Sequence, residues 1–317
     1  MTGYLIRRLL QAVVVLLGVM LIMFLLIHVI PGGEARAALG PRASQAQVRA
    51  FNRQNGLDLP LWDQFFRYIW SLTRFHLGDS VSLNEPVRTA IANRLPKTLV
   101  LVGLSTIVAL VVAIPLGILQ VIRRNKPIDY GLTGLSFILY AMPTFLLGTL
   151  LILWFSADIK IFPSEAPQGQ SIGSILGDPR ALVLPVFTLA AVEIAAFSRY
   201  MRSSMMETLT EDYVRTARAK GAAPRRVLYV HALRNAIIPI VTLVGLSIGA
   251  VVSGAVITED VFNFPGMGKL AVDSATKLDV PVLLGTTFVA TVATVVGNLL
   301  ADIVYAVVDP RIRYARA

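Results

Sequence analysis

The chain has 317 residues, of which 55% are hydrophobic and only 15% are charged, and its formal net charge is +10 at pH 7. A soluble domain carries about 25% charged residues, so a soluble protein of this composition would have too few polar groups to cover its surface. The basic residues flank long apolar stretches instead of forming one basic face, which argues against nucleic-acid binding and is typical of membrane topology.

Six stretches are long and apolar enough to cross a membrane, because about 20 helical residues span a hydrocarbon core about 30 Å thick. In chain order, these stretches are residues 9–30, 98–122, 131–157, 181–201, 236–258 and 280–308. Pro115, Pro143 and Pro185 lie inside three of them, which is tolerated where neighbouring helices satisfy the backbone. The sequence therefore predicts an all-α, polytopic membrane protein with six transmembrane helices in a single domain, residues 1–317.

The first apolar stretch also has features of a cleaved signal peptide. Arg7 and Arg8 precede it, and Ala35-Arg36-Ala37 imitates a signal-peptidase site. The apolar core of a signal peptide is about 7–15 residues long, and residues 9–30 exceed that length. A retained first helix is therefore expected.

Lys and Arg residues are unequally divided between the two sides of the predicted helices. Sixteen lie in the N-terminus, the 2–3 loop, the 4–5 loop and the C-terminal tail, against four in the 3–4 and 5–6 loops. Because short basic loops stay on the cytoplasmic side, both termini are predicted to be cytoplasmic. Segment 31–97 is then extracytoplasmic, since charge in loops longer than about 60 residues has little effect on orientation.

Segment 31–97 contains an aromatic-rich run, residues 61–72, that is expected to form a short helix at the outer interface. Trp and Tyr are favoured in the headgroup layer, so one interpretation is a membrane anchor. The other is a lid or docking ledge over an external opening. The sequence leaves both open.

Motifs for catalysis or nucleotide binding are absent from the sequence. The run Gly266-Met267-Gly268-Lys269-Leu270 lacks the spacing and the hydroxyl of a phosphate-binding loop, and no zinc-protease, hydrolase or dinucleotide fingerprint occurs. Cysteine is absent and the three histidines are far apart, so no metal site is expected. The chain is therefore predicted not to be an enzyme and to bind no cofactor, so energy for uphill transport must come from elsewhere.

The predicted cytoplasmic loop 199–235 is the candidate for the place where that energy enters. Four apolar positions recur at helical spacing: Met206, Leu209, Tyr213 and Ala217. Gly221 suits a helix C-terminus and Pro224 the first position of a following helix, which predicts a helix–turn–helix. The alternative is a basic loop resting on anionic headgroups.

Residues 212–221, Asp-Tyr-Val-Arg-Thr-Ala-Arg-Ala-Lys-Gly, and residues 231–235, His-Ala-Leu-Arg-Asn, resemble the coupling segment of ABC importer permeases, specifically the dipeptide/oligopeptide permease family. In the general importer motif, a Glu-Ala-Ala triplet precedes a glycine. Here Arg215, Thr216 and Ala217 precede Gly221, so only the last alanine and the glycine are kept. This departure leaves the exact ATPase contacts open.

Other segments similar to that family follow in the family's order along nearly the whole chain. They include Tyr4-Leu5-Ile6-Arg7-Arg8, Leu77-Gly78-Asp79-Ser80, Phe264-Pro265-Gly266-Met267-Gly268 and Asp309-Pro310-Arg311-Ile312-Arg313. Each segment alone is a weak signal. Their order and spacing together make the resemblance specific.

The resemblance implies the type I ABC importer permease fold, with a homologous second permease subunit, two cytoplasmic ATPase subunits and an extracytoplasmic substrate-binding protein. ATP and Mg would be used by the ATPase subunits, and this chain would move di- or oligopeptides, or a similar small solute, by alternating access. The residues expected to couple it to the ATPase are Tyr213, Arg215, Thr216, Ala217, Arg218, Lys220 and Gly221.

Three further residues are candidates for the translocation path. Glu193 lies inside the fourth predicted helix, where a carboxylate is costly. It either faces a cavity and attracts a peptide ammonium group, or it bonds to a neighbouring helix. Glu259 and Phe262 lie in the 5–6 loop, which forms either a gate or an interfacial turn.

The rival function is a secondary transporter driven by an ion gradient. Such transporters often contain internal repeats and broken helices with intramembrane charges. The sequence has no evident internal repeat, and Glu193 is the one carboxylate expected to be buried in the membrane. The ABC importer interpretation is therefore preferred.

Overall fold

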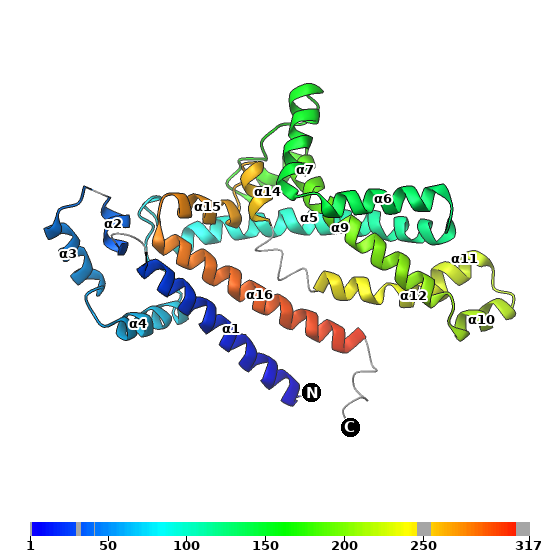
Figure 1. Cartoon of the computed structure of the whole chain (residues 1–317), viewed down its shortest axis with the longest axis horizontal. Coiled ribbons are helices and arrows are strands. Elements are labelled where there is room, and N and C mark those ends of the chain that lie inside the picture. Colours follow the sequence, from blue (N-terminus) through cyan, green and yellow to red (C-terminus); the bar gives the residue numbers. More distant parts are fainter. Residues whose placement is uncertain (1, 30–32, 41, 246–254, 309–317) are drawn as a thin grey trace. The chain divides into compact units, whose positions relative to one another are not determined.

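A computed structural model describes residues 2–29, 33–40, 42–245 and 255–308 (Figure 1). Within these ranges the regular elements are all helices, which confirms the predicted all-α class. The chain forms two compact units, Met1–Thr98 with Pro265–Val296, and Leu99–Phe264 with Gly297–Ala317. Whether these units act as the single predicted domain stays a prediction.

The first unit is built from helices at both ends of the sequence. It comprises α1 (Thr2–His28), α2 (Gly33–Leu39), α3 (Gln45–Asn55), α4 (Leu61–Thr73), the start of α5 (Val87–Ile122), α15 (Met267–Thr276) and most of α16 (Val280–Val308). Local sequence defines α3: Ser44 and Gln47 form a reciprocal capping box, and Gly56 ends the helix at φ +67°.

Helix α4 is the short helix predicted in segment 31–97, and one of its faces packs on α1. The Phe24 ring lies 5.4 Å from Phe65 and 6.2 Å from Tyr68, measured between centroids. The uncovered face of α4 carries three exposed aromatic side chains: Trp62, Phe66 and Trp70. The helix is confirmed, and its role as anchor or ledge stays a prediction.

The start of α16 is held by a buried carboxylate. Asp279 is 2% exposed, and its Oδ2 accepts hydrogen bonds from Ser80 Oγ at 2.6 Å, Ser82 N at 2.9 Å and Ser82 Oγ at 2.7 Å. Charge-assisted bonds of this length are strong. They fix the loop that follows α4 to the beginning of α16.

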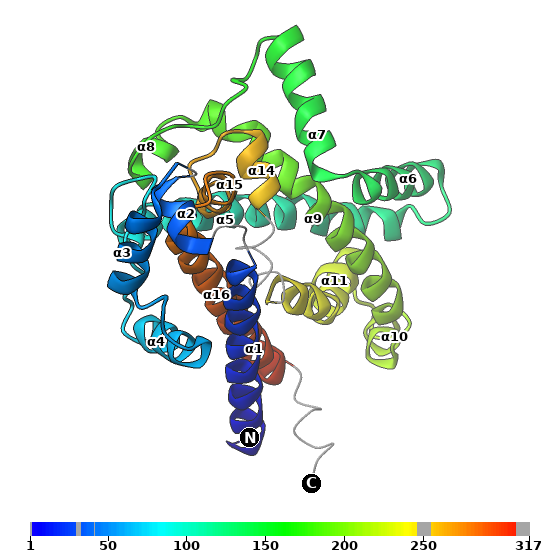
Figure 2. The ribbon, with the colours of Figure 1, turned by 60° about the vertical axis from the view of Figure 1, so that its left-hand side comes forward.

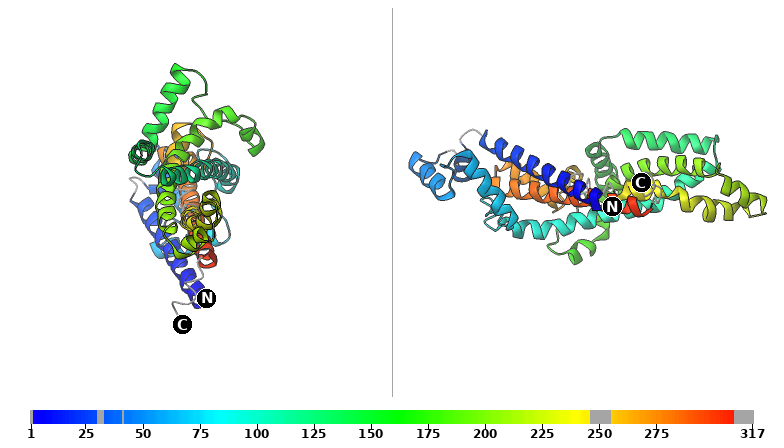
Figure 3. Two further views of the ribbon diagram at one scale, coloured as in Figure 1. Left: turned by 90° about the vertical axis from the view of Figure 1, so that its right-hand side faces the viewer. Right: turned by 90° about the horizontal axis from the view of Figure 1, so that it is seen from below.

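The second unit contains the central helices of the chain (Figure 2). It comprises the rest of α5, α6 (Pro127–Ala141), α7 (Thr144–Leu151), the π-helix η1 (Ile152–Asp158), α8 (Ile172–Leu176), α9 (Pro179–Thr208), α10 (Asp212–Ala219), α11 (Pro224–Arg226), the π-helix η2 (Val227–Ala232), α12 (Leu233–Ala236) and α14 (Val256–Val261). Helix α6 packs along α9 (Figure 3).

Five helices in the described ranges are long and apolar enough to cross a membrane: Arg7–His28, Val87–Ile122, Pro179–Thr208, Pro224–Gly245 and Val280–Leu299. The pair Pro127–Ala141 and Thr144–Asp158 gives a sixth span if it is counted as one. Counted in this way the spans number six, in the predicted order. The fifth, Pro224–Gly245, begins twelve residues before the predicted stretch 236–258 and includes the end of the predicted loop 199–235. Part of the fifth predicted stretch, residues 246–254, and the tail motif 309–317 lie outside the described residues.

The third predicted span, 131–157, is not one continuous helix. Its halves, α6 and α7, are bent by 106° at Met142-Pro143 (Figure 2). Met142 is extended, at φ −75° and ψ 125°, because the ring of a following proline disfavours the helical conformation. The sequence analysis gave residues 131–157 as one stretch and did not predict this break.

Candidate functional site

The predicted coupling residues gather on α10 and the turn that follows it. Helix α9 ends at Thr208, and Leu209–Glu211 make a tight turn in which Thr210 N bonds to Glu207 O at 3.1 Å and Glu211 N to Thr208 O at 3.2 Å. Helix α10 then starts with Asp212 and ends beside Arg218, charges that suit the helix dipole.

This turn corrects one expectation about the loop. Met206 lies in the last turn of α9 and Leu209 caps that helix, whereas Tyr213 and Ala217 belong to α10, so the four do not form one continuous helical face. The side chain that anchors α10 is instead Val214, which is fully buried. Sequence periodicity missed it because the helix breaks at Thr210-Glu211, although Val214 is an aliphatic residue among polar neighbours.

The turn after α10 has the predicted local chemistry. Gly221 adopts φ +80°, and Pro224 occupies the first turn of α11. Ala222 N donates to Ala217 O at 3.1 Å and closes the helix end. A Cβ at Gly221 would meet no atom within 4 Å, so a substitution there strains the backbone without a collision.

The coupling residues present an exposed surface with a cationic edge. Most of the set is exposed, namely Tyr213, Arg215, Thr216, Arg218, Lys220 and Gly221, while Ala217 is half-buried. Asp212 makes an exposed ion pair with Arg215 at 3.6 Å. Tyr213 Oη accepts a hydrogen bond from Asn235 Nδ2 at 2.7 Å, which ties α10 to α12.

A common core supports this surface. Buried side chains of α5, α9, η2 and α12 form one cluster, which includes Ile118, Met201, Met205, Ala232 and Ala236. Helix α10 packs on η2. The exposed residues of α10 are thus supported by η2 and α12, and the hydrogen-bonded turn Leu209–Glu211 joins α10 to the end of α9.

A buried ion pair joins α6 to α9, and the sequence analysis did not identify it. Arg202 Nε lies 2.9 Å from Asp129 Oδ1 and Arg202 Nη2 lies 3.0 Å from Oδ2, while Asn125 N donates to Oδ2 at 3.1 Å. The Asp129 side chain is only 3% exposed. A possible signal was the lone acid directly after the basic run Arg123–Lys126.

Further contacts continue along the same pair of helices. Arg199 lies over the rings of Phe137 and Tyr140, with centroid distances of 4.9 and 5.3 Å. On α5, a Cβ added to Gly117 would lie 2.6 Å from Met201 Cβ, so only glycine permits α5 and α9 to approach this closely. Helices α5, α6 and α9 are therefore locked together near α10.

Glu193 lies on α9 within the candidate membrane span. Thr106 Oγ1 on α5 donates to its Oε1 at 3.2 Å, whereas Oε2 is buried and has no hydrogen-bond partner in the described part of the chain. The hydrogen bond to a neighbouring helix, one of the two alternatives, is present. Whether the side chain also faces the translocation path stays a prediction.

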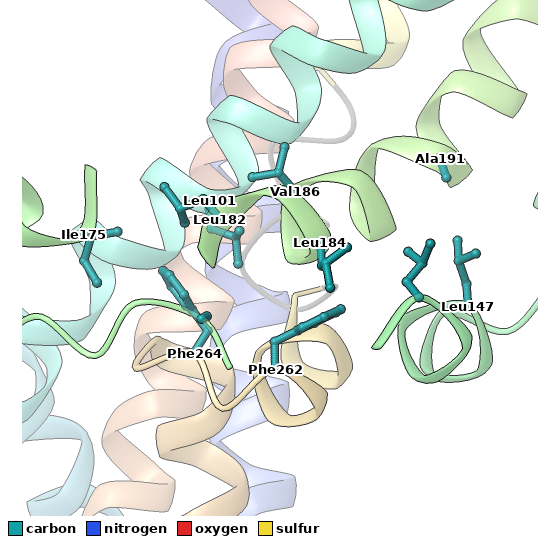
Figure 4. Packing of buried hydrophobic residues seen from close by; sticks show 11 residues of the cluster. Leu101, Leu147, Ile175, Leu182, Leu184, Val186, Ala191, Phe262 and Phe264 are labelled. Carbon is teal, nitrogen blue, oxygen red and sulfur yellow. The ribbon is translucent and has the colours of Figure 1, made fainter. Parts of the chain in front are cut away.

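The 5–6 loop is folded into the core of the second unit (Figure 4). Phe262 is 1% exposed and Glu259 is fully buried. Ala166 N donates to Phe262 O at 2.8 Å, and Gln168 Nε2 donates to Asn263 O at 2.7 Å. These contacts give Phe262 a packing role against the 3–4 segment, while a gating role for the loop stays a prediction.

Comparison with known proteins places this arrangement among transport proteins. The family described as binding-protein-dependent transport system inner membrane component matches residues 113–314. The family that describes the N-terminal part of such membrane components matches residues 1–102.

Individual relatives align with the chain from end to end. The oligopeptide transport system permease protein AppB of Bacillus subtilis (strain 168) is 41% identical, over 99% of this chain and 100% of that protein. The dipeptide transport system permease protein DppB of Escherichia coli (strain K12) is 33% identical over 100% of both chains. The di/tripeptide transport system permease protein DppB of Pseudomonas aeruginosa (strain UCBPP-PA14) is 36% identical, also over 100% of both.

Proposed function

Because the chain belongs to the family of inner membrane components of binding-protein-dependent transport systems, we propose that it lets di- or oligopeptides cross the plasma membrane by alternating access. It is the permease subunit of an ABC importer and is not itself catalytic. Peptides are proposed as the cargo because the relatives that align over the full chain are named oligopeptide, dipeptide and di/tripeptide permeases.

Such an importer works with ATPase and substrate-binding subunits. The proposed assembly has two ATPase subunits on the cytoplasmic side, which use ATP and Mg, and a homologous second permease subunit beside this chain. The binding protein delivers peptide on the opposite side. Both termini of this chain are proposed to be cytoplasmic, on the side of the basic loop that contains α10.

The observation that carries the coupling role is the exposed surface of α10. The Tyr213–Asn235 hydrogen bond ties this helix to α12 and Val214 is buried, while the coupling residues other than Ala217 are exposed and available to a partner. We place α10 in a groove of one ATPase, with the small Ala217 side chain permitting close approach. Closure of the ATPase pair then favours one state of the membrane helices over the other.

The path for the peptide is proposed to pass Glu193, whose unpartnered Oε2 suits an ammonium group. Glu259 and Phe262 are proposed to border the same path from the 5–6 loop. Both side chains are buried in this structure, so this proposal requires the loop to open during the transport cycle.

The test is ATP hydrolysis and peptide uptake measured on the same reconstituted complex with its ATPase and binding-protein subunits. Ala217→Glu introduces a larger, charged side chain at a half-buried position of the docking surface, and Gly221→Val costs about 1 kcal/mol of backbone strain at positive φ. Both variants are expected to weaken ATPase docking or reduce uptake per ATP, whereas peptide binding by the binding protein stays unchanged. Arg218→Ala is the matched mild variant, because an exposed ion pair contributes only about 0–1 kcal/mol.

Wild-type uptake per ATP in both severe variants would show that α10 is not the coupling element. Uptake that collapses with the proton gradient while ATP is present would instead favour the secondary-transporter alternative.

A further inference from the structure

The Asp129 carboxylate joins three parts of the second unit. It accepts two hydrogen bonds from Arg202 on α9 and one from the backbone of Asn125, in the turn between α5 and α6. Asn125 adopts φ +59°, a conformation that needs local support in a non-glycine residue. One side chain therefore stabilises the α5–α6 turn and fastens that turn to α9.

The geometry of this contact is that of a rigid joint. Both Arg202–Asp129 bonds are short and parallel, which is the fork arrangement that restricts orientation as well as distance. The Asp129 side chain is only 3% exposed, whereas the Arg202 side chain is 27% exposed, so the carboxylate is buried and its partner is half-buried. Sliding of α6 along α9 would leave this carboxylate buried without its counter-charge.

The joint lies close to α10. Arg202 lies six positions before the end of α9 at Thr208, and the hydrogen-bonded turn Leu209–Glu211 then leads directly into α10. Gly117 on α5 contacts Met201, the residue beside Arg202. The end of α9 thus connects α10 to α5 through the Gly117–Met201 contact and to α6 through the Asp129–Arg202 ion pair.

We propose that the Asp129–Arg202 ion pair is a positioning element that makes the α5–α6 hairpin and α9 one rigid body, so that movement of α10 on the ATPase is transmitted to those membrane helices. The proposal rests on the proposed coupling role of α10. Asp129 and Arg202 touch neither peptide nor nucleotide in this scheme. They act through the helices that they join.

The experiment uses the absence of cysteine from the chain, which allows a unique thiol pair to be introduced. Asp129→Cys and Arg202→Cys are combined in the full importer complex, and uptake and ATP hydrolysis are measured before and after bridging with a short bifunctional thiol reagent. Without the bridge, uptake per ATP is expected to fall about tenfold, a size typical of coupling between sites. With the bridge, it should recover, because a rigid body works equally well when its parts are covalently joined.

Two results would overturn the proposal. A bridged complex that hydrolyses ATP but does not transport would mean that α6 and α9 must move past each other. Wild-type uptake per ATP in the unbridged variant would mean that the Asp129–Arg202 ion pair is dispensable. If that variant does not assemble, Arg202→Lys replaces it, because lysine keeps the charge and loses the fork. A wild-type ratio in Arg202→Lys also overturns the proposal.

Two controls separate this proposal from others. Asp273→Asn removes an acid from the half-exposed ion pair with Lys269 on α15 and should leave uptake per ATP unchanged. Ala217→Glu is measured in parallel. If Ala217→Glu uncouples the complex while the bridged variant fails to transport, the coupling role of α10 stands and only the rigid-body inference is lost.

Discussion

At the scale of single residues, the buried polar groups of this protein differ in how fully they are satisfied. Both oxygens of Asp129 are bonded. Asp279 and Glu193 each have one buried oxygen without a partner in the described residues, but the other oxygen of Asp279 accepts three hydrogen bonds and that of Glu193 only one. A well-bonded carboxylate is suited to holding structure. An unpartnered one at membrane depth is suited to a passing cation.

Glu193→Gln is expected to reduce peptide uptake while complex assembly and basal ATP hydrolysis persist. Glutamine keeps the size of the side chain and the hydrogen bond from Thr106, and it removes only the negative charge. Uptake and ATPase rates of the reconstituted complex are the measurement. A variant that does not assemble would assign Glu193 to helix packing, and unchanged uptake would remove it from the path.

Asp279→Asn is expected to lower the stability of the protein at neutral pH by about 2 kcal/mol, since hydrogen bonds to a charged group are stronger than neutral ones. Burial raises the pKa of Asp279, but the hydrogen bonds from Ser80, Ser82 and Val282 outweigh it, so its pKa lies below the ordinary 3.8. A carboxylate with a lowered pKa stabilises the fold above the unfolded-state pKa, and this contribution is lost as pH falls through the folded-state pKa.

Thermal unfolding of the detergent-solubilised protein measures this effect. The difference in Tm between wild type and Asp279→Asn should be full at neutral pH and should narrow only as pH falls below 3.8. Ser80→Ala is the milder companion, because two donors from Ser82 remain. A difference in Tm that is independent of pH would contradict the charge-based explanation.

At the scale of helices, the sequence correctly predicted features that depend on the backbone preferences of single residues. Gly221 has the positive φ expected after α10, and Pro224 begins the next helix as expected, because both depend on only a few neighbouring residues. The six apolar stretches were located because a membrane span must be long and apolar. Their bounds do not follow from composition alone, because the third stretch is bent at Met142-Pro143 and the fifth span begins at Pro224.

Tertiary contacts account for what the sequence did not reveal. The joint between Asp129 and Arg202 connects residues 73 apart, and no spacing rule links them. Val214 was missed because its burial depends on η2, which packs on α10 from a later part of the chain. The break at Met142-Pro143 was underestimated because membrane context alone does not decide whether a proline is tolerated or bends a helix.

At the scale of the whole molecule, the second unit contains the candidate coupling surface and Glu193, while the first contains the segment proposed to be extracytoplasmic. The multi-pass membrane character follows from the family and from the five or six candidate spans. The proposed orientation, with both termini in the cytoplasm, rests on the unequal distribution of Lys and Arg between the loops on the two sides.

Topology can be tested by introducing single cysteines into the naturally cysteine-free chain and labelling them in intact cells with a membrane-impermeant reagent. Positions Lys126 and Arg225 are expected to be protected until the membrane is permeabilised. Positions Glu165 and Asp273 are expected to react from outside. The opposite accessibility at any two of these positions would overturn the predicted topology.

The length of α9 has a mechanical consequence for the transport cycle. Between Glu193 and Thr208 this helix contains no proline, and the proline inside it, Pro185, lies beyond Glu193. Fifteen residues of helix make a lever arm of about 22 Å, so a tilt of about 5° at the α10 end displaces the Glu193 level by about 2 Å. A small tilt of α9 at the membrane surface therefore moves Glu193 by a distance comparable with the radius of an ammonium group.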